Sequence, residues 1–516
     1  MTKRYLMRLG KSPFDVADAF HTLDRNWLGT NSGNLIYGAA SHKLFSTQDT
    51  VVEANHYRIN GKMADQVNAE YDGFILPLAN CFRPDFEDHL RRTADFLERL
   101  TIPFVMLSGG AQLPLDGDPS ALRAMEPTIT RFARAVLSGS SALTVRGEMT
   151  AEYLRSLGFH DVVVVGCPSL TLHGPGHRVE VPETLAPGAP IAYNLETKDP
   201  FGGDLIADAE RHYRATYIAQ EHGTLELMLW ATSPYDADDP RLPLERSHPQ
   251  FTAARAEMYI DAYPWIGRLE QMAFSFGARA HGNIAAVLAG TPSVMLAHDS
   301  RTLELAQHHG IPYLIRGSEH MPHSVQELYS QADFTEFNRG HLERFETLSS
   351  FLHENGFEHI YDPGQESARA DYERRVAEMS FPPAVRPTWI GESPEATQRH
   401  AVLQDRDVRR KKTQAAIRRE ATNREKRTQE QLAQLSLRVE EVGQRLEQEQ
   451  RRADAAEKRR EAAEKHAAKA EARLTTLDER LRTITQQVGE ANDRAQRAVR
   501  IPTRLKDALT RSPRER

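Results

Sequence analysis

The sequence predicts an α/β protein with two parallel-sheet domains and a long C-terminal coiled coil. Three observations predict this class. Short apolar runs alternate with amphipathic segments over the first 380 residues, Gly- and Pro-rich stretches at 173–190 and 382–394 divide the chain, and a heptad pattern fills most of the remainder. The expected parts are an N-terminal domain at 1–180, a second domain at 181–380, a linker at 381–404, a coiled coil at 405–500 and a basic tail at 501–516.

The N-terminal domain is predicted from four apolar runs of strand length. They lie at 74–79, 102–107, 142–146 and 162–166, and helices are expected at 85–100 and 148–157. Near-continuous Val, Ile and Leu are typical of strands that are buried on both faces. Their alternation with helical segments predicts a parallel sheet with helices on both sides.

A second α/β series follows the first Gly- and Pro-rich stretch. We expect strands at 191–196, 224–232 and 293–298, and helices at 213–223, 262–271 and 283–289. Segment 274–314 carries the clearest pattern, because strand, turn and helix follow one another twice. Residues 320–380 are predicted to be mostly helical and to pack back across the two domains.

The C-terminal region is predicted to be a coiled coil that joins copies of the chain. Its seam follows a strict 3,4 repeat in which 18 of the 20 positions are apolar, the exceptions being Glu449 and Arg460. The seam positions are Leu432, Leu435, Val439, Val442, Leu446, Glu449, Ala453, Ala456, Arg460, Ala463, Ala467, Ala470, Leu474, Leu477, Leu481, Ile484, Val488, Ala491, Ala495 and Ala498. A single solvated helix with chance periodicity remains the alternative.

Charge and cysteine content bound the function. Residues 401–516 carry 30 Lys and Arg against 20 Asp and Glu, whereas residues 1–400 carry 35 against 52. The acidic enzyme-like part argues against nucleic acid as a partner. The basic tail could lie on an anionic membrane surface or be merely solvated. Two cysteines and the lack of a signal-like or membrane-spanning apolar run predict a cytoplasmic protein.

Arg279 and His281 form the strongest candidate site. Arginine supplies a permanent charge and a fork of donors for a carboxylate or phosphate, and histidine can move a proton near neutral pH. The turn that carries them precedes a helix, whose N-terminus favours anions, and Gly282 allows close ligand approach. A surface turn with two polar residues is the alternative interpretation.

Other candidates lie where predicted strands end or helices begin. Arg146 and Arg301 follow strands and could join one cationic cluster with Arg279 and His281. Further contacts are expected from the turn with Asn31, Gly33 and Asn34 and from Gly109 and Gly110 after the strand at 102–107. The alternative interpretation is structural: these residues could cap the N-termini of helices or form salt bridges where helices begin. We predict no metal, because no HExxH or paired Cys/His spacing occurs.

In this order, the motifs resemble the polysaccharide pyruvyl transferase family. The matching pieces are the Asn-x-Gly helix entry at 31–33, IPFVMLSGGAQ at 102–112, TVRGEMTAEYLRSLGF at 144–159, VVVVGCPSL at 162–170, and the GxRxHG…AxxxGTPxV…LA…GIP block at 277–312. The resemblance implies two facing Rossmann-like domains, similar to the glycosyltransferase B architecture, with the active site in the cleft. The predicted coil lies outside the part that resembles the family.

The resemblance also implies an activity. Phosphoenolpyruvate would be the donor, and its pyruvate would become a cyclic ketal on two hydroxyls of a cell-surface glycan, with release of phosphate and without a cofactor. Arg146, Arg279 and His281 match the family's functional residues, and Arg301 stands where the family usually has lysine. His281 would be the general acid that protonates the methylene carbon.

Three departures from the family pattern concern acidic residues. Asn34 and Cys167 stand where the family has carboxylates, and Glu148 is displaced by one position because Gly147 follows Arg146. Two alternative functions therefore stay open. One is a nucleotide-sugar-dependent glycosyltransferase of similar fold, and the other is a catalytically decayed head on a coiled-coil scaffold.

Overall fold

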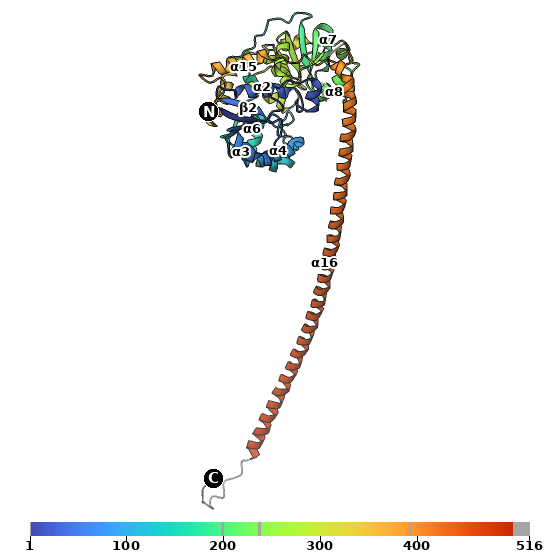
Figure 1. Cartoon of the computed structure of the whole chain (residues 1–516). Coiled ribbons are helices and arrows are strands. Elements are labelled where there is room, and N and C mark those ends of the chain that lie inside the picture. The colour runs from blue at the N-terminus through green and yellow to red at the C-terminus, as the bar shows by residue number, and fades with distance from the viewer. Residues whose placement is uncertain (1, 198–200, 236–238, 392–393, 499–516) are drawn as a thin grey trace, which may run out of the picture. The chain divides into compact units, whose positions relative to one another are not determined.

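The computed structural model describes residues 2–197, 201–235, 239–391 and 394–498. The chain forms two compact units, Met1–Asp407 and Val408–Arg516 (Figure 1). The predicted basic tail at 501–516 lies outside the described residues. The predicted class, two parallel α/β sheets followed by a long helix, is confirmed.

The first half of the larger unit is built on a parallel sheet in the order β2-β1-β3-β4. Its strands are β1 (Lys3–Met7), β2 (Thr50–Ala54), β3 (Gly73–Pro77) and β4 (Phe104–Leu107), and a short parallel pair, β5 (Leu143–Val145) and β6 (Val162–Val164), continues it through a bridge between Gly109 and Val145. The helices are α1 (Ala19–Asp24), α2 (Gly33–Leu44), α3 (Ala64–Glu70), α4 (Glu87–Leu97), α5 (Glu126–Leu137) and α6 (Glu148–Ser156), with 3₁₀ turns at Gly61–Met63, Pro84–Phe86, Ser120–Met125 and Pro168–Thr171. All four strands predicted here are confirmed.

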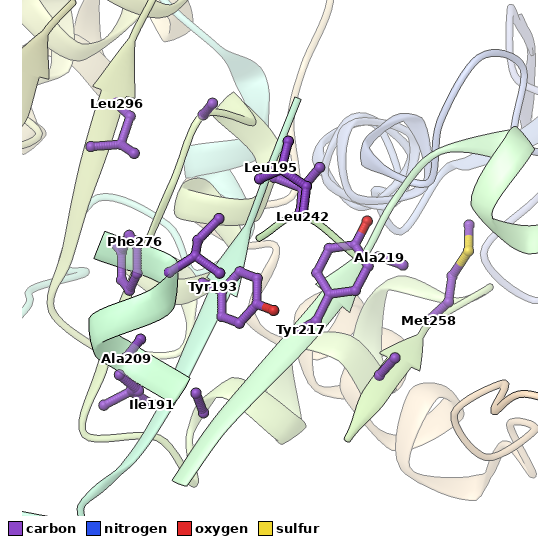
Figure 2. Packing of buried hydrophobic residues seen from close by; sticks show 14 of the residues in the cluster. Ile191, Tyr193, Leu195, Ala209, Tyr217, Ala219, Leu242, Met258, Phe276 and Leu296 are labelled. Carbon is purple, nitrogen blue, oxygen red and sulfur yellow. The ribbon is translucent and has the colours of Figure 1, made fainter. Parts of the chain in front are cut away.

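The second half holds a six-stranded parallel sheet in the order β12-β11-β10-β7-β8-β9. Its strands are β7 (Pro190–Asn194), β8 (Arg214–Ala219), β9 (Ala256–Met258), β10 (Phe274–Gly277), β11 (Ser293–Ala297) and β12 (Tyr313–Ile315). Its helices are α7 (Gly203–His212), α8 (His222–Trp230), α9 (Pro249–Thr252), α10 (Ala262–Leu269), α11 (Ala280–Leu288) and α12 (Ser300–His309). Tyr193 stacks between Tyr217 and Phe276 on one face of the sheet, with ring centroids 5.5 and 6.1 Å apart (Figure 2).

Two predicted elements of this half are wrong and change places. The expected helix at 213–223 contains strand β8, and the expected strand at 224–232 lies in helix α8. β8 is a central strand with five of its six residues buried. Helix α8 buries Leu225, Leu227 and Met228, among others. A helix that is apolar on most sides gives the same continuous apolar run as a buried strand, so periodicity could not separate the two.

The C-terminal helices of the larger unit tie its halves together, as predicted. They are α13 (Val325–Tyr329), α14 (Thr335–Glu354) and α15 (Glu366–Glu378). Phe337 near the start of α14 packs in the core cluster of α10 and α11, whereas Leu348 and Leu352 near its end pack with Tyr5 and Met7 of β1. One helix therefore spans both cores and holds the two sheets in one unit.

The expected linker at 381–404 is not a free connection. Val385 forms an antiparallel bridge with Met258 of β9, and Thr388 donates its hydroxyl to the carbonyl of Leu229 at 2.9 Å. Helix α16 (Pro394–Ala498) begins inside this segment and runs for 105 residues. In the described part of the chain, no helix combines the length and apolarity needed to cross a membrane.

Candidate active site

A cavity of about 820 Å³ opens at the carboxyl ends of strands from both sheets. Six of the residues singled out from the sequence line it: Asn31, Asn34, Arg146, Arg279, His281 and Arg301. Gly33, Gly109, Gly110 and Gly282 are not among the lining residues. In open parallel sheets this edge is the usual place for ligands, because loops and helix N-termini converge there.

Arg146 follows β5 and is only 4% exposed. Among the described residues, its Nε and Nη2 atoms have no hydrogen-bond partner, although both are buried. Gly110 makes room for it, since a Cβ at that position would lie 2.9 Å from Cδ of Arg146. A buried guanidinium without partners is costly, and an anion in the cavity would satisfy it.

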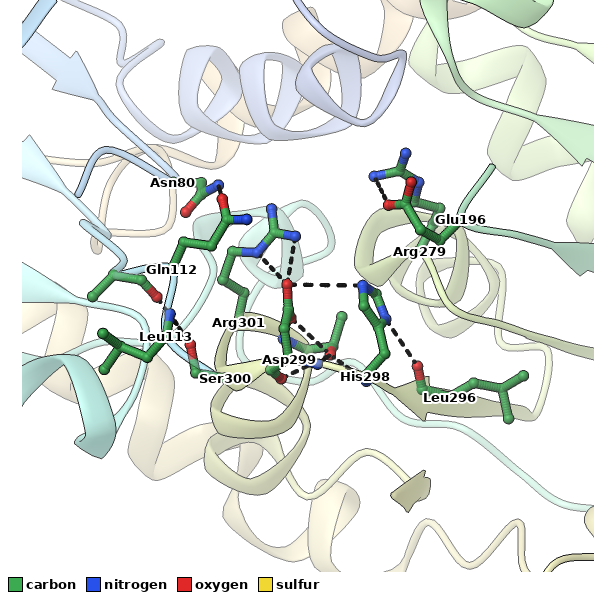
Figure 3. A network of polar contacts seen from close by, with 12 residues as sticks. Asn80, Gln112, Leu113, Glu196, Arg279, Leu296, His298, Asp299, Ser300 and Arg301 are labelled. Atoms are coloured by element: carbon green, nitrogen blue, oxygen red, sulfur yellow. Dashed lines mark hydrogen bonds and ion pairs between the residues drawn. The ribbon is translucent and has the colours of Figure 1, made fainter. Parts of the chain in front are cut away.

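Arg279 is the residue before helix α11, and its backbone N–H donates to Asn194 at 2.8 Å. Its guanidinium pairs with Glu196 at 2.9 Å and also with Glu221 (Figure 3 shows Glu196 beside it). The three side chains are each about one-sixth exposed. Arg279 therefore reaches the cavity with its charge already balanced by two carboxylates.

Arg301 is also paired, in its case with Asp299 (Figure 3). Its Nε donates to Oδ2 of Asp299 at 2.6 Å, and Asp299 caps helix α12 by accepting from Thr302 N–H at 3.1 Å. Burial opposes ionisation of Asp299, but Arg301 and His298 outweigh it and hold its pKa below the usual value. The three arginines thus share one cavity, and Arg301 and Arg279 are both bound to carboxylates.

His281 lies in the first turn of α11 and is partly buried in the cavity wall. Burial, followed by the nearby charge of Arg146, lowers its pKa to about 3. The imidazole is therefore neutral at pH 7 in the protein itself. Helix α2 approaches it closely, because a Cβ at Gly33 would lie 2.7 Å from the Cβ of His281.

The thiol of Cys167 lies close to His281. Its Sγ lies 3.7 Å from Nε2 of His281 and 3.2 Å from the hydroxyl of Ser169, and its N–H donates to Nε2 of His309 at 2.7 Å. Burial raises the pKa of this thiol. The position where the resemblance implies a carboxylate thus holds a neutral thiol, which gives His281 no negative charge to stabilise a proton.

The turn before α2 is positioned by its own asparagines. Oδ1 of Asn31 accepts the N–H of Gly33 at 2.9 Å, and Nδ2 of Asn34 donates to the carbonyl of Leu28 at 2.8 Å. A Cβ at Gly282 would lie 2.5 Å from the amides of Asn194 and Gln220. These residues bring the N-termini of α2 and α11 to the same cavity.

Sequence reasoning missed the two carboxylates that hold Arg279. Glu196 follows β7 and Glu221 precedes α8, so both lie at the carboxyl edge of the second sheet. A correct assignment of β8 and α8 would have placed Glu221 at a strand end beside the candidate site. The swapped assignment put it inside an expected helix instead.

One group of potential metal ligands occurs in the described residues, away from the cavity lining. His353, His359 and Asp362 place ligand atoms within 4.8 Å of one another. Nδ1 of His359 accepts the N–H of Tyr361 at 3.2 Å, and its Nε2 lies 2.7 Å from the hydroxyl of Ser349. The ring nitrogen that faces Asp362 then carries the proton, so these residues form a hydrogen-bond network that joins α14 to the following loop.

Among solved structures, similar chains include a putative UDP-N-acetylglucosamine 2-epimerase from Listeria monocytogenes, at 10% identity and a TM-score of 0.35, with 74% of this chain and 99% of that chain covered. The glycosyltransferase SnogD from Streptomyces nogalater is similar at 12% identity and a TM-score of 0.29, covering 72% and 100%. Anabaena Alr3699/HepE, in complex with UDP and glucose, has 12% identity and a TM-score of 0.32, covering 73% and 100%. Likeness of this degree identifies neither a substrate nor a reaction.

A search among curated proteins finds no match. A family model does match, over a segment that contains Arg146, Arg279 and His281 together with the strands and helices that carry them. Residues 83–300 match the polysaccharide pyruvyl transferase family, as the order of the motifs predicted.

Proposed function

We propose that this protein is a transferase that moves pyruvate from phosphoenolpyruvate onto two hydroxyls of a saccharide as a cyclic ketal and releases phosphate. The observation that carries the proposal is Arg146, a buried guanidinium at the cavity wall with two nitrogens that lack partners among the described residues. The donor has a carboxylate and a phosphate, and either would complete the hydrogen bonds of Arg146.

The neutral state of His281 sets the order of events. With a pKa of about 3, the ring carries no proton at pH 7 before the donor binds. An anion held beside Arg146 adds negative charge next to the ring and raises that pKa, so donor binding would load the proton that the methylene carbon later receives. His281 is then the general acid only in the donor complex.

The protons of the two sugar hydroxyls also need acceptors. Protonation of the methylene makes the enol carbon electrophilic, and a sugar hydroxyl adds to it as its proton passes to a carboxylate. Glu196 and Glu221 line the cavity and are the nearest candidates for that role. Phosphate leaves, the second hydroxyl closes the ring, and its proton departs with the phosphate, so the reaction needs no oxidant or reductant.

Self-association through α16 is part of the proposal. The seam of α16 places Leu474, Leu477 and Leu481 on one face, and each is more than half exposed. Burial of such a stripe against other copies of the chain is the usual way in which a heptad helix becomes stable in water. We place the reaction in the cytoplasm, and flotation with anionic liposomes, with and without residues 501–516, tests whether the tail binds a membrane.

Incubation of the full chain with phosphoenolpyruvate and a panel of saccharides tests the reaction. We expect mass spectrometry to detect a pyruvate adduct on the saccharide and stoichiometric phosphate release. His281→Ala should lower turnover by about 10²–10⁴-fold, because general acid catalysis contributes on that order. Stabilisation by nucleotide sugars but not by phosphoenolpyruvate in thermal shift would favour a glycosyltransferase, and stabilisation by neither would favour a decayed enzyme.

A further inference from the structure

Helix α16 carries an apolar stripe that continues through its C-terminal third (Figure 1 labels the helix). Leu474, Leu477, Leu481, Ile484 and Val488 are between 55% and 66% exposed. Their spacing of three and four residues places them on one face of the helix. Exposed apolar side chains in such a row are usually buried against a partner. The charged residues beside the stripe indicate which partner fits.

The two edges of the stripe carry opposite charges. In the four heptads between residues 452 and 478, a basic residue stands just before the first seam position, and these residues are Arg452, Arg459, His466 and Arg473. In the same four heptads an acidic residue stands just after the second seam position, and these residues are Glu457, Glu464, Glu471 and Asp478. All eight side chains are exposed in the described part of the helix. One edge is therefore basic and the other acidic over four consecutive heptads.

This arrangement distinguishes the two ways in which identical helices can pair. In a parallel pair in register, the residue before the seam faces the residue five positions later on the partner. Arg452 then meets Glu457 of the other copy, Arg459 meets Glu464, and Arg473 meets Asp478. In an antiparallel pair, like edges face each other, so arginines would lie against arginines and carboxylates against carboxylates.

We propose that a second copy of this chain covers the stripe in a parallel, in-register, two-stranded coiled coil. The inference rests on the self-association proposed above and is independent of the reaction. By two-fold symmetry, each of these three attractive contacts occurs twice. Both chains enter the coil from the same end, so the larger units of both copies are attached at that end of the coil.

Two charged seam residues favour two strands over three or four. Arg460 occupies a seam position, and its Nε reaches out to Glu464 at 2.9 Å, with 81% of its side chain exposed. Glu449 occupies another seam position and is 77% exposed. In a two-stranded coil such long side chains still reach water at the edge of the seam, whereas a wider bundle would bury the charges.

Disulfide cross-linking of the full chain tests the orientation. Ala456 and Ala491 are equivalent seam positions 35 residues apart, and Ala472 faces outward. We expect Ala456→Cys and Ala491→Cys each to form a dimer with itself on oxidation, while Ala472→Cys does not. The native cysteines are buried and give little background. In an antiparallel pair, a residue faces its own counterpart only at the centre of the coil, so at most one of the two seam variants could form a disulfide with itself. Failure of either seam variant to form this disulfide in a dimeric protein therefore overturns the parallel arrangement.

Charge reversal tests the pairing rule by sedimentation. The triple variant Arg452→Glu, Arg459→Glu and Arg473→Glu places like charges at six contacts, so we expect the dimer dissociation constant to rise on the order of a hundredfold. Mixing it with Glu457→Lys, Glu464→Lys and Asp478→Lys chains should restore tight pairing. An unchanged dissociation constant for the triple variant overturns the parallel register. A measured mass of three or four chains overturns the proposed strand number. A monomeric wild-type chain overturns self-association and leaves the proposed reaction unaffected.

Discussion

Two arginines of one cavity have different electrostatic surroundings. Among the described residues, Arg146 lacks hydrogen-bond partners at two buried nitrogens, whereas Arg279 lacks one only at Nε and is paired with Glu196 and Glu221. The sequence predicts the same donor-binding role for both. We therefore propose Arg146 as the direct anion contact and Arg279 as the residue that neutralises the two carboxylates beside it.

Substitution at these arginines should separate the two roles. Arg146→Gln is expected to raise the KM for phosphoenolpyruvate about 10–100-fold, because a charge-assisted hydrogen bond is lost. Arg279→Ala should also weaken donor binding, since Glu196 and Glu221 lose the positive charge that balances them and then repel the anionic donor. The double variant Arg279→Ala, Glu221→Gln should regain part of that affinity. Equal loss in the single and double variants would show that Arg279 contacts the donor itself. Steady-state kinetics and calorimetry measure both effects.

Cys167 offers a direct test of how His281 is tuned. Its Sγ lies 3.7 Å from Nε2 of His281. Cys167→Asp places an anion near the ring, and because an opposite charge favours the protonated imidazole, the pKa of His281 should rise from about 3. The isosteric Cys167→Ser variant is the control and should leave that pKa low. NMR titration of the histidine gives the values, and a low pKa in both variants would exclude the electrostatic explanation.

Among the elements, helices α2 and α11 determine the site because their N-termini meet at the cavity. Gly33 begins α2 and lies against His281 in the first turn of α11. Gly33→Ala would bring a Cβ to 2.7 Å from the Cβ of His281, so the ring must move. We expect kcat to fall about tenfold or more with a smaller change in donor KM. Gly176→Ala is the matched control, since nothing lies within 4 Å of its Cβ. Equal activity of the two variants would contradict this role for Gly33.

Whether a helix or strand could be predicted from the sequence depended on how much of it is buried. Strands β3, β4, β10 and β11, in which every residue is buried, were predicted because their runs are short, apolar and flanked by turns. β1 and β2 were missed. β1 begins with two exposed residues, and only one of the five residues of β2, at the edge of the sheet, is buried. Helix α8 was mistaken for a strand because most of its residues are buried.

The candidate site was predicted to the same uneven degree. Sequence motifs placed Arg146, Arg279 and His281 at one edge, and all three line one cavity. The pairing of Arg279 with two carboxylates could not be predicted from the sequence, because Glu196 and Glu221 come from segments far from Arg279 along the chain. The tuning of His281 was also beyond sequence, since it depends on burial and on Arg146 rather than on adjacent residues.

At the scale of the whole molecule, buried histidines should make the larger unit sensitive to acid. Among the described residues five histidines are buried, and burial lowers the pKa of each below its usual value: His42, His248, His309, His341 and His359. The value for His42 is about 4. The unfolded chain binds these protons near pH 6.5, so stability is full above that pH and falls as the pH drops toward 4. Glu304 and Asp261 have the opposite effect on stability. Burial raises their pKa values to about 7 and 6, so the folded protein takes up their protons first and is stabilised as the pH falls.

Thermal unfolding between pH 8 and pH 5 measures this balance. All four tryptophans, Trp27, Trp230, Trp265 and Trp389, lie in the larger unit, so their fluorescence follows it separately from the coil. Each histidine that stays neutral in the fold costs about 1.4 kcal/mol per pH unit below 6.5, and two carboxyls cannot offset five such groups. We expect Tm to fall steadily below pH 6.5. His42→Gln should flatten the slope, whereas the exposed His212→Gln should not. A Tm that holds or rises toward pH 5 would mean that these histidines take up protons within the folded protein.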